Sequence, residues 1–361
     1  MTESVDLSQL EHWVPRLLTW WQTNQKSYPW SETRNPYEVW ISEVMLQQTV
    51  VSAVPSRYER WLQRWPTVEA LALAQEGEVL REWEGLGYYS RGANLWKAAQ
   101  VLAVQGASCF PSNEEALRKL PGVGSYTAAA IASFAFNRPS LTLDANLKRV
   151  FQRLNVWPQW TVESEKATTS LATEVFKLYP SRSFNLALMH LGQQVCRSRG
   201  PECGACPLVQ VCLAYQQNQT DLIPARLDRQ VQEKSTPLLV GWRQIPLPNR
   251  QTPPPIQIFL AQPLTGRFSR LWSFPPRVSE LSRVSECENC LNLGTFLHTY
   301  TKYKDTLYPV LCAVEEPELT AGWKGRWYTA DEVERLAMPA VHRRIWLAAK
   351  SALSQTFPLS S

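Results

Sequence analysis

The sequence predicts two domains: a mainly α N-terminal domain of residues 1–215 and a smaller α+β domain of residues 238–361. Three observations lead to this organisation. A chain of 361 residues is long for a single domain. Apolar residues recur at three- and four-residue steps through the first part, which is the period of an amphipathic helix. After Tyr215 the pattern changes to short β-branched and aromatic runs bounded by prolines, which is typical of strands.

The helical pattern is clear from Asn35 to Trp65, where Pro55 divides it into two helices because proline is tolerated in the first helical turn. Further helices are predicted in later segments that are separated by loops rich in Gly or Pro. Their approximate ranges are 67–74, 76–84, 94–103, 113–120, 127–136, 145–154, 164–179 and 184–195. Because the connections are short, the sequence predicts a packed helical domain.

The second part of the chain follows a predicted linker, residues 216–237, which is polar and charged with little periodicity. Strands and helices then alternate without an internal repeat. Strands are predicted at 238–242, 256–260 and 307–314, and helices at 331–337 and 341–353. The second domain is therefore predicted to be α+β.

Composition limits the class of protein. A hydrophobic content of 44% is ordinary for a globular chain, and no apolar run approaches the length of a membrane span. The net charge of +5 permits a polyanionic partner without requiring one. Most of the 16 tryptophans are expected to fill cores. Without a targeting signal, a cytoplasmic, nucleoid-associated location is expected, with no membrane partner.

Four cysteines lie within residues 196–212 with the spacing C-x6-C-x2-C-x5-C: Cys196, Cys203, Cys206 and Cys212. Ligation by four thiolates is the usual way to hold a 4Fe–4S cluster, so the spacing predicts this cofactor. A structural zinc stays an alternative, although zinc sites usually pair two short knuckles and only Cys203 and Cys206 form one. A disulfide knot conflicts with an N-terminus that lacks a secretory pattern. The remaining cysteines are interpreted as buried or incidental thiols: Cys109, Cys287, Cys290 and Cys312.

The string Leu120-Pro-Gly-Val-Gly124 lies between two predicted helices. A Gly-x-Gly turn at a helix N-terminus exposes backbone N–H groups, which suits a phosphate. Gly122 and Gly124 are therefore candidate DNA-binding residues that position a strand without reading its bases. A plain connection between helices is the alternative, since glycine also serves tight turns.

Several strings resemble the MutY family of adenine DNA glycosylases, in the iron–sulfur branch of the helix-hairpin-helix DNA glycosylase superfamily. They are residues 39–49 (VWISEVMLQQT), 85–91 (GLGYYSR) and 143–150 (LDANLKRV). The resemblance is dense over residues 10–215. It is weaker in the second domain, where residues 271–275 and 338–346 are similar to the family's Nudix-like domain.

The resemblance implies base-excision repair: hydrolysis of the N-glycosidic bond of adenine mispaired with 8-oxoguanine or guanine. It assigns Glu43 the role of the general acid that protonates adenine. Glu43 lies on a strongly apolar helix, where desolvation raises the pKa of a carboxyl, although a surface glutamate near a helix start is the alternative. The implied partner is double-stranded DNA containing a mismatch, and the protein is expected to be a monomer.

Asp144 precedes a predicted helix and is a good N-cap. The resemblance makes it the carboxylate that stabilises the cationic sugar, and backbone N–H groups are expected to hold it ionised. Asn146 resembles the family residue that hydrogen-bonds near the acid and the sugar. Tyr126 stands where the related endonuclease III family carries a nucleophilic lysine, so a monofunctional glycosylase is expected.

Gln48, Leu86 and Tyr88 resemble the residues that fill the gap left by an extruded base. Burial against a neighbouring helix is the alternative for Leu86 and Tyr88. The C-terminal motif that reads 8-oxoguanine in the family is replaced by Tyr300-Thr301-Lys302, where Thr301 keeps a hydroxyl. This departure leaves the stringency for the opposite base open.

Further departures from the family are Leu186, Ser31 and Ala145, of which Leu186 stands near the adenine pocket. Two other functions therefore stay open. One is a glycosylase of altered mismatch specificity. The other is a catalytically silent iron–sulfur module that binds DNA lesions, which the presence of both Glu43 and Asp144 disfavours.

Overall fold

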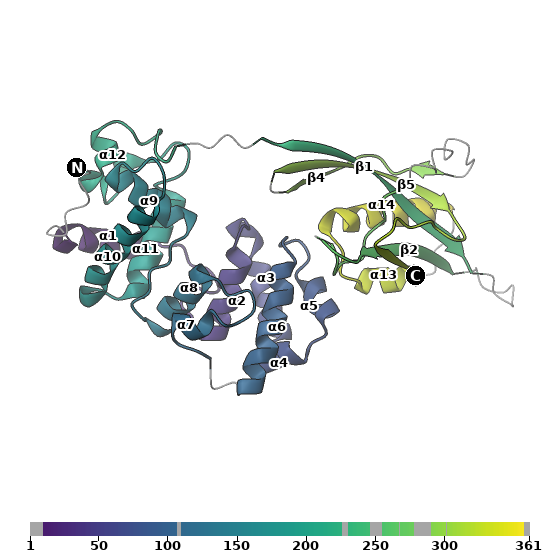
Figure 1. The fold of residues 1–361 in the computed structure, drawn as a ribbon, viewed down its shortest axis with the longest axis horizontal. Coiled ribbons are helices and arrows are strands. Elements are labelled where there is room, and N and C mark those ends of the chain that lie inside the picture. Colours follow the sequence, from purple (N-terminus) through teal and green to yellow (C-terminus); the bar gives the residue numbers. More distant parts are fainter. Residues whose placement is uncertain are drawn as a thin grey trace. The chain divides into compact units, whose positions relative to one another are not determined.

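The computed structural model describes residues 10–106, 110–225, 230–245, 255–266, 268–277, 290–300 and 302–356. The chain forms two compact units, which Figure 1 shows as a helical part and a part built on a sheet. Unit 1 comprises Met1–Leu73 and Asn94–Asp228, and unit 2 comprises Ala74–Ala93 and Arg229–Ser361. The boundary expected from the sequence assigns residues 74–93 to the N-terminal domain, whereas in the structure they pack with C-terminal residues.

Unit 1 is helical, as the periodicity predicts. Its helices are α1 (Leu10–Asn24), α2 (Pro36–Leu46), α3 (Pro55–Arg64), α4 (Val68–Leu73), α6 (Ser90–Gln105, which begins in unit 2), α7 (Glu114–Leu117), α8 (Ser125–Phe136), α9 (Ala145–Asn155), α10 (Val162–Leu178), α11 (Ser181–Gln194) and α12 (Leu213–Gln216). The short 3₁₀ helices are η2 (Val51–Ala53), η4 (Cys203–Ala205) and η5 (Val209–Val211). The α helices predicted from Asn35 onward are confirmed, and α1 and α12 are additions.

Tertiary packing brings α2 against α8, and α11 against α1, α8 and α9. Trp13, Trp40 and Trp61 are fully buried in this unit and fill its core. The start of α2 is set locally, because the side chain of Asn35 accepts the Tyr37 N–H at 3.0 Å. The α2–α8 contact is the one that builds the site described below.

Unit 2 has a mixed sheet in the order β3-β5-β1-β2-β6, with β4 also paired to β5. Its strands are β1 (Gln232–Gln244), β2 (Ile256–Pro263), β3 (Leu291–Asn292), β4 (Phe296–Tyr300), β5 (Tyr303–Ala313) and β6 (Trp323–Thr329). Strands β1 and β5 are parallel, and the other pairs are antiparallel. The helices are α5 (Glu76–Glu82), α13 (Ala330–Arg335) and α14 (Ala340–Thr356). The α+β class is confirmed.

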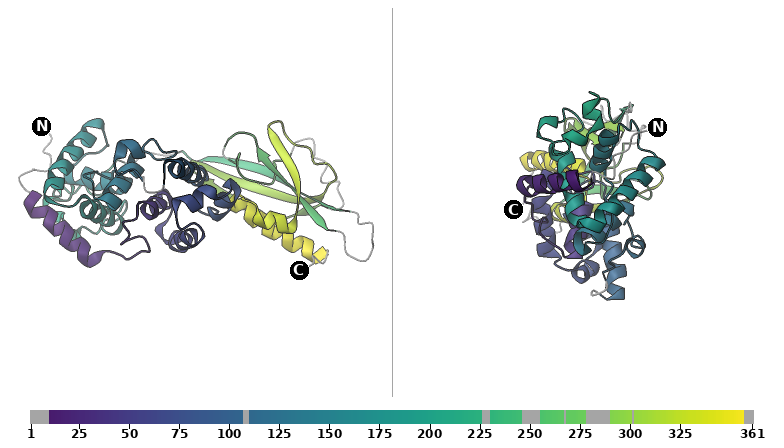
Figure 2. Two further views of the ribbon diagram at one scale, coloured as in Figure 1. Left: turned by 90° about the horizontal axis from the view of Figure 1, so that it is seen from below. Right: turned by 90° about the vertical axis from the view of Figure 1, so that its left-hand side faces the viewer.

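One face of this sheet packs against α14 (Figure 2). Ile345 and Trp346 of α14 are buried together with Val240 and Ile258 of the strands. The predicted linker 216–237 is too long at its C-terminal end, because β1 begins at Gln232 and pairs there with Tyr303. The residues at this end of β1 are polar and show no strand periodicity. They belong to the sheet because their backbone pairs with β5.

The interpretation of the remaining cysteines as buried or incidental thiols is wrong for two of them. Cys290 and Cys312 form a disulfide within unit 2. Cys109 and Cys287 lie outside the described residues. Among the described helices, none is both long and apolar enough to cross a bilayer.

Candidate active site

The side chain of Glu43 lies at the contact between α2 and α8. It is only 4% exposed, on a helix whose residues are buried almost continuously from Val39 to Met45. The Tyr126 hydroxyl, in the first turn of α8, donates to Glu43 Oε2 at 2.8 Å. One turn further along the chain, Gln47 Nε2 donates to Thr127 Oγ1 at 2.9 Å. The first bond orients the carboxyl of Glu43, and the second joins the end of α2 to α8.

Burial raises the pKa of Glu43 to about 7, and the nearby charge of Asp144 adds to this rise. The Tyr126 hydrogen bond and the Arg182 charge act in the opposite direction. At neutral pH a substantial fraction of Glu43 is therefore protonated and able to donate a proton. The expectation of a carboxyl with a raised pKa agrees with this environment, and the surface alternative does not.

Asp144 is the N-cap of α9, as predicted. Its Oδ1 accepts the Leu147 N–H and its Oδ2 accepts Asn146 Nδ2, both at 2.7 Å. Burial raises the pKa of Asp144, while these hydrogen bonds and the charge of Arg149 act to lower it. The expected lowering by the helix N-terminus is thus present but outweighed by desolvation. Both carboxyls have raised pKa values, and Asp144 accepts the larger number of hydrogen bonds.

Arg149 supports Asn146 from behind, and sequence reasoning did not single it out. Its Nη2 donates to Asn146 Oδ1 at 2.9 Å and to the Gly192 carbonyl oxygen at 2.7 Å, while Nε donates to the Cys196 carbonyl oxygen at 2.8 Å. A Cβ at Gly192 would lie 2.7 Å from Cβ of Asn146, so only glycine permits this approach of α11 to α9. The sequence signal that could have identified Arg149 is a basic residue one helical turn after Asn146.

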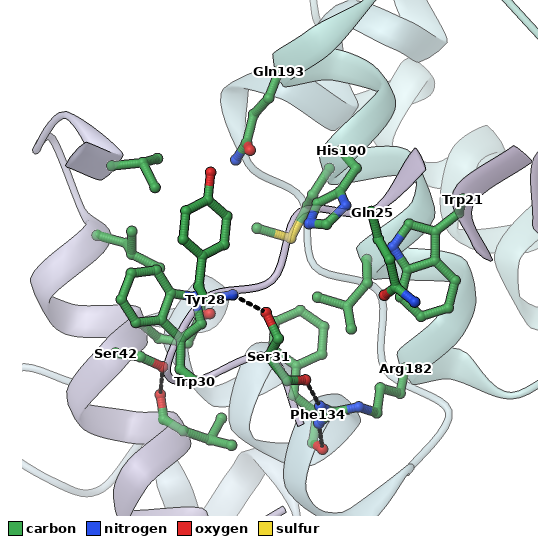
Figure 3. Close-up of a pocket in the computed structure, with 16 residues that line it drawn as sticks. Trp21, Gln25, Tyr28, Trp30, Ser31, Ser42, Phe134, Arg182, His190 and Gln193 are labelled. Carbon is green, nitrogen blue, oxygen red and sulfur yellow. Dashed lines mark hydrogen bonds between the residues drawn. The ribbon is translucent and has the colours of Figure 1, made fainter. Parts of the chain in front are cut away.

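A pocket opens beside Glu43, and Figure 3 shows many of its lining residues. Arg182 lines the pocket and donates to the Phe134 carbonyl oxygen and, through Nη2, to that of Ser31 at 2.7 Å. The rings of Tyr28 and Trp30 stack with centroids 5.1 Å apart. The lining also includes Leu186, His190 and Gln193 from α11. Sequence reasoning placed Leu186 near this pocket but missed Arg182 and the aromatic residues, whose segment before α2 has no helical period.

The turn between α7 and α8 presents both candidate glycines to solvent. Gly122 has φ of +75°, and a Cβ there would lie 2.5 Å from Cβ of Asn94, so the position requires glycine. Gly124 is the N-cap residue of α8 and has open space around it. The open space at Gly124 is compatible with the expected approach of an anion to the start of α8.

The four cysteines of residues 196–212 line one small cavity together with Arg153. Arg153 Nη1 donates to Cys196 Sγ at 3.3 Å, and its Nε donates to the Ile223 carbonyl oxygen at 2.8 Å. In the part of the chain that the structure describes, no group of three or more His, Cys, Asp or Glu side chains is arranged so that it could hold a metal ion. A shared cavity lined by four thiols and a cation fits the donor set that a cluster requires.

Comparison with known proteins agrees with this arrangement. The model of the HhH-GPD superfamily of base excision DNA repair proteins matches residues 41–177. An adenine DNA glycosylase of Mus musculus is 30% identical over 408 residues, which cover 94% of this chain and 78% of the mouse protein. The chain belongs to the adenine DNA glycosylase family. An adenine DNA glycosylase of Mycobacterium tuberculosis is 40% identical over 197 residues, covering 53% of this chain and 64% of that protein. A solved thermostable thymine-DNA glycosylase superposes with a TM-score of 0.52 at 28% identity, covering 58% of this chain and 98% of its own.

In this member of the adenine DNA glycosylase family, the candidate gap-filling residues differ in accessibility. Gln48 is exposed with φ of +53°, and Tyr88 is 45% exposed with φ of +44°. Leu86 is only 3% exposed, so its side chain packs inside unit 2 and the burial alternative fits it better than insertion into a duplex. Thr301 lies outside the described residues, and its neighbour Tyr300 ends β4.

Proposed function

We propose that this protein is a base-excision repair enzyme that removes adenine mispaired with 8-oxoguanine or guanine in duplex DNA, acting as a monomer and without cleaving the strand. The observation that carries the proposal is the Glu43 carboxyl, buried beside a pocket and bonded to Tyr126. A protonated carboxyl in a dry pocket is the group that turns a purine into a leaving group.

In the proposed reaction Glu43 transfers its proton to a ring nitrogen of the extruded adenine. The bond between the base and the sugar then breaks, and its electron pair leaves with the base. The carboxylate of Asp144 stabilises the positive charge that develops on the sugar, as in other glycoside cleavages that use two carboxyls. Water adds to the sugar and passes a proton to the Glu43 carboxylate, which restores the acid and leaves an abasic site and free adenine. Asn146 keeps the Asp144 carboxylate oriented through its 2.7 Å hydrogen bond.

The monofunctional character is proposed from Tyr126. A phenol cannot form the imine through which a lysine at this position would promote strand cleavage. Burial and the neighbouring carboxyls raise the pKa of Tyr126 well above its ordinary value, so its hydroxyl keeps its proton and serves as a hydrogen-bond donor to Glu43.

We also propose that Cys196, Cys203, Cys206 and Cys212 hold a 4Fe–4S cluster, supported by the cavity they share. When bound, the cluster ties residues 196–212 together through four iron–thiolate bonds. The chain's own contribution is Arg153, which donates to Cys196 Sγ and to the carbonyl oxygen of Arg197. The proposed chemistry of base removal uses none of these groups.

A second candidate is a glycosylase of altered mismatch specificity. It is favoured by Leu186 and Ser31, both of which line the pocket beside Glu43. Leucine offers no hydrogen bond to a base, and the Ser31 hydroxyl is already engaged by the Tyr28 N–H at 2.9 Å. The base readout therefore rests on the other polar groups of the pocket.

A single-turnover assay on duplexes containing A:8-oxoG, A:G, A:C or T:G tests the proposal. We expect adenine release from the first two and at least a ~100-fold loss of rate in Glu43→Gln with mismatch binding retained. Glu59→Gln, the same change on the exposed face of α3, is the matched control and is expected to keep full activity. Release of thymine in place of adenine would favour the second candidate, and binding without base loss would favour a silent lesion-binding module.

A further inference from the structure

A buried ion pair lies directly before the turn that carries Tyr88. The Arg343 guanidinium on α14 contacts both carboxylate oxygens of Glu84, with Nε 3.1 Å from Oε1 and Nη2 3.2 Å from Oε2. The two side chains are only 11% and 12% exposed. The same guanidinium donates to the carbonyl oxygens of Val333 and Leu336 at 2.9 and 2.6 Å. A buried charge is costly unless it is paired in good geometry. This arrangement therefore holds the Glu84 side chain against Arg343 of α14.

The turn that follows is tied down from its inner side. Gly87 and Tyr88 have φ of +71° and +44°. Arg91 Nη2 donates to the Leu86 carbonyl oxygen at 2.7 Å, and Trp83 Nε1 donates to that of Gly87 at 3.0 Å. A non-glycine residue keeps a positive φ only where its surroundings over-determine it, and such strain concentrates at functional sites. The turn therefore holds the Tyr88 backbone in a strained left-handed conformation, from which the ring is exposed.

Further contacts attach the same segment to C-terminal residues of unit 2. The Tyr89 hydroxyl donates to the Met338 carbonyl oxygen at 2.8 Å, and Arg81 Nε donates to that of Glu334 at 3.0 Å. Between these contacts an apolar cluster is buried: Leu80, Ala93, Leu271 and Ala337. Residues 74–93 are thus packed as a part of unit 2, although they lie within the helical region of the sequence.

Phe268 connects this attachment to the hairpin formed by β4 and β5. It packs against the apolar cluster and stacks on His298, with centroids 6.1 Å apart and an interplanar angle of 15°. The His298 ring lies 5.0 Å from Tyr300, which lies 5.3 Å from Tyr303 across the hairpin. One continuous set of packed side chains therefore connects the Tyr88 turn to the β4–β5 hairpin. By the family resemblance, this hairpin is where the opposite base is read.

We propose that Arg343 and Glu84 are positioning residues for mismatch recognition. Their pair fixes the Tyr88 turn on α14, so that the Tyr88 ring and the β4–β5 hairpin engage the mismatch as one body, while base removal is carried out by residues of unit 1. This inference rests on the proposed function, because it takes Tyr88 to contact DNA. It adds that the C-terminal helix sets the position of that contact from a distance.

A double-mutant cycle between Arg343→Gln and Tyr88→Ala tests the inference. The readouts are the Kd for an A:8-oxoG duplex, the Kd for a matched duplex, and the single-turnover rate at saturating enzyme. We expect Arg343→Gln to weaken mismatch binding at least tenfold, with little effect on matched DNA and less than a threefold effect on the saturated rate. In the Tyr88→Ala background the effect of Arg343→Gln should nearly disappear. Arg335→Gln, which removes the same charge from the exposed end of α13, controls for general attraction to phosphate.

The outcomes separate the inference from the function on which it rests. If Tyr88→Ala binds the mismatch normally, the DNA contact of Tyr88 is wrong. If Tyr88→Ala weakens binding but Arg343→Gln does not, or if the two effects add independently, the positioning role is refuted. Should Arg343→Gln unfold at lower temperature, Glu84→Gln/Arg343→Gln removes both buried charges together and gives the deciding measurement by the same cycle. The remaining charged neighbours of the pair are Arg81, which is partly exposed, and Glu334, which stays paired with Lys350. Arg343→Lys keeps the charge without the two-pronged contact and is expected to restore binding only in part.

Discussion

The hydroxyl of Tyr126 donates a 2.8 Å hydrogen bond to the Glu43 carboxyl across the contact between α8 and α2. This bond lowers the pKa of Glu43, whereas burial raises it by a larger amount. The balance leaves the acid poised near neutral pH, which is the range in which a general acid is most effective. The first predictions follow from this balance.

The rate of adenine excision should depend on the protonation of Glu43. Because its pKa is raised to about 7, the acid form is lost as the pH rises through that value. We expect the single-turnover rate to fall about tenfold per pH unit well above pH 7. Rates measured from pH 5.5 to 9 check this, and a rate that is flat up to pH 9 would contradict the assignment of Glu43 as the acid.

The same shift predicts a pH-dependent cost in stability. A folded-state pKa above the unfolded value of 4.5 means that stability is fully present below pH 4.5 and is lost as the pH rises through about 7. Between pH 5 and pH 8.5 the unchanged protein should lose up to about 3 kcal/mol more of its unfolding free energy than Glu43→Gln loses, because only the unchanged protein must ionise a buried carboxyl. Denaturant unfolding at both pH values measures the difference, and equal pH dependence of the two proteins would show that burial does not shift this group.

Tyr126→Phe tests the hydrogen bond itself. Removing a bond that lowers the pKa of Glu43 should move the alkaline limb of the rate profile to higher pH. The ratio of the variant rate to the unchanged rate should therefore be larger at pH 8.5 than at pH 6.5. A profile that keeps its midpoint would mean that the phenol does not influence the acid.

Borohydride trapping tests the monofunctional assignment. Because Tyr126 has no amine, we expect no efficient covalent adduct with abasic DNA in the presence of borohydride. A lysine-dependent glycosylase run in parallel supplies the positive control. Efficient trapping of this protein would assign strand-cleaving chemistry to another amine of the chain.

The cluster predicts a dependence on the cysteines of residues 196–212. Cys206→Ser should lower iron and sulfide content, remove most of the broad visible absorbance of the purified protein and lower its thermal stability. Cys290→Ser, outside that stretch, should leave iron and sulfide content unchanged and is the matched control. Purified protein with normal stability but without iron or sulfide would refute the cluster, and zinc in its place would support the alternative.

Local patterns in the sequence were sufficient to predict most helices. Apolar periodicity sets the buried face of a helix, and capping residues such as Asn35 and Asp144 set where it starts, so both signals lie within a few residues of each other. Likewise the four thiols of residues 196–212 are brought to one cavity by short connections along the chain. Strands β3, β4 and β6 were not predicted. Strand β6 pairs with β2, far away in the sequence, and β3 pairs with β5, with β4 between them in the chain, whereas β4 is a short strand that pairs with the adjacent β5.

Only the tertiary structure decided what surrounds these residues. The pKa of Glu43 depends on desolvation by α8 and on Tyr126, which is 83 positions away in the sequence. The attachment of residues 74–93 to α14 includes the ion pair between Glu84 and Arg343, which lies 259 positions further along the chain. The sequence by itself determined which chemical groups this protein carries and which helices and caps hold them, because those signals act over short chain distances. Their protonation, exposure and partnership arise from burial, which only long-range packing creates.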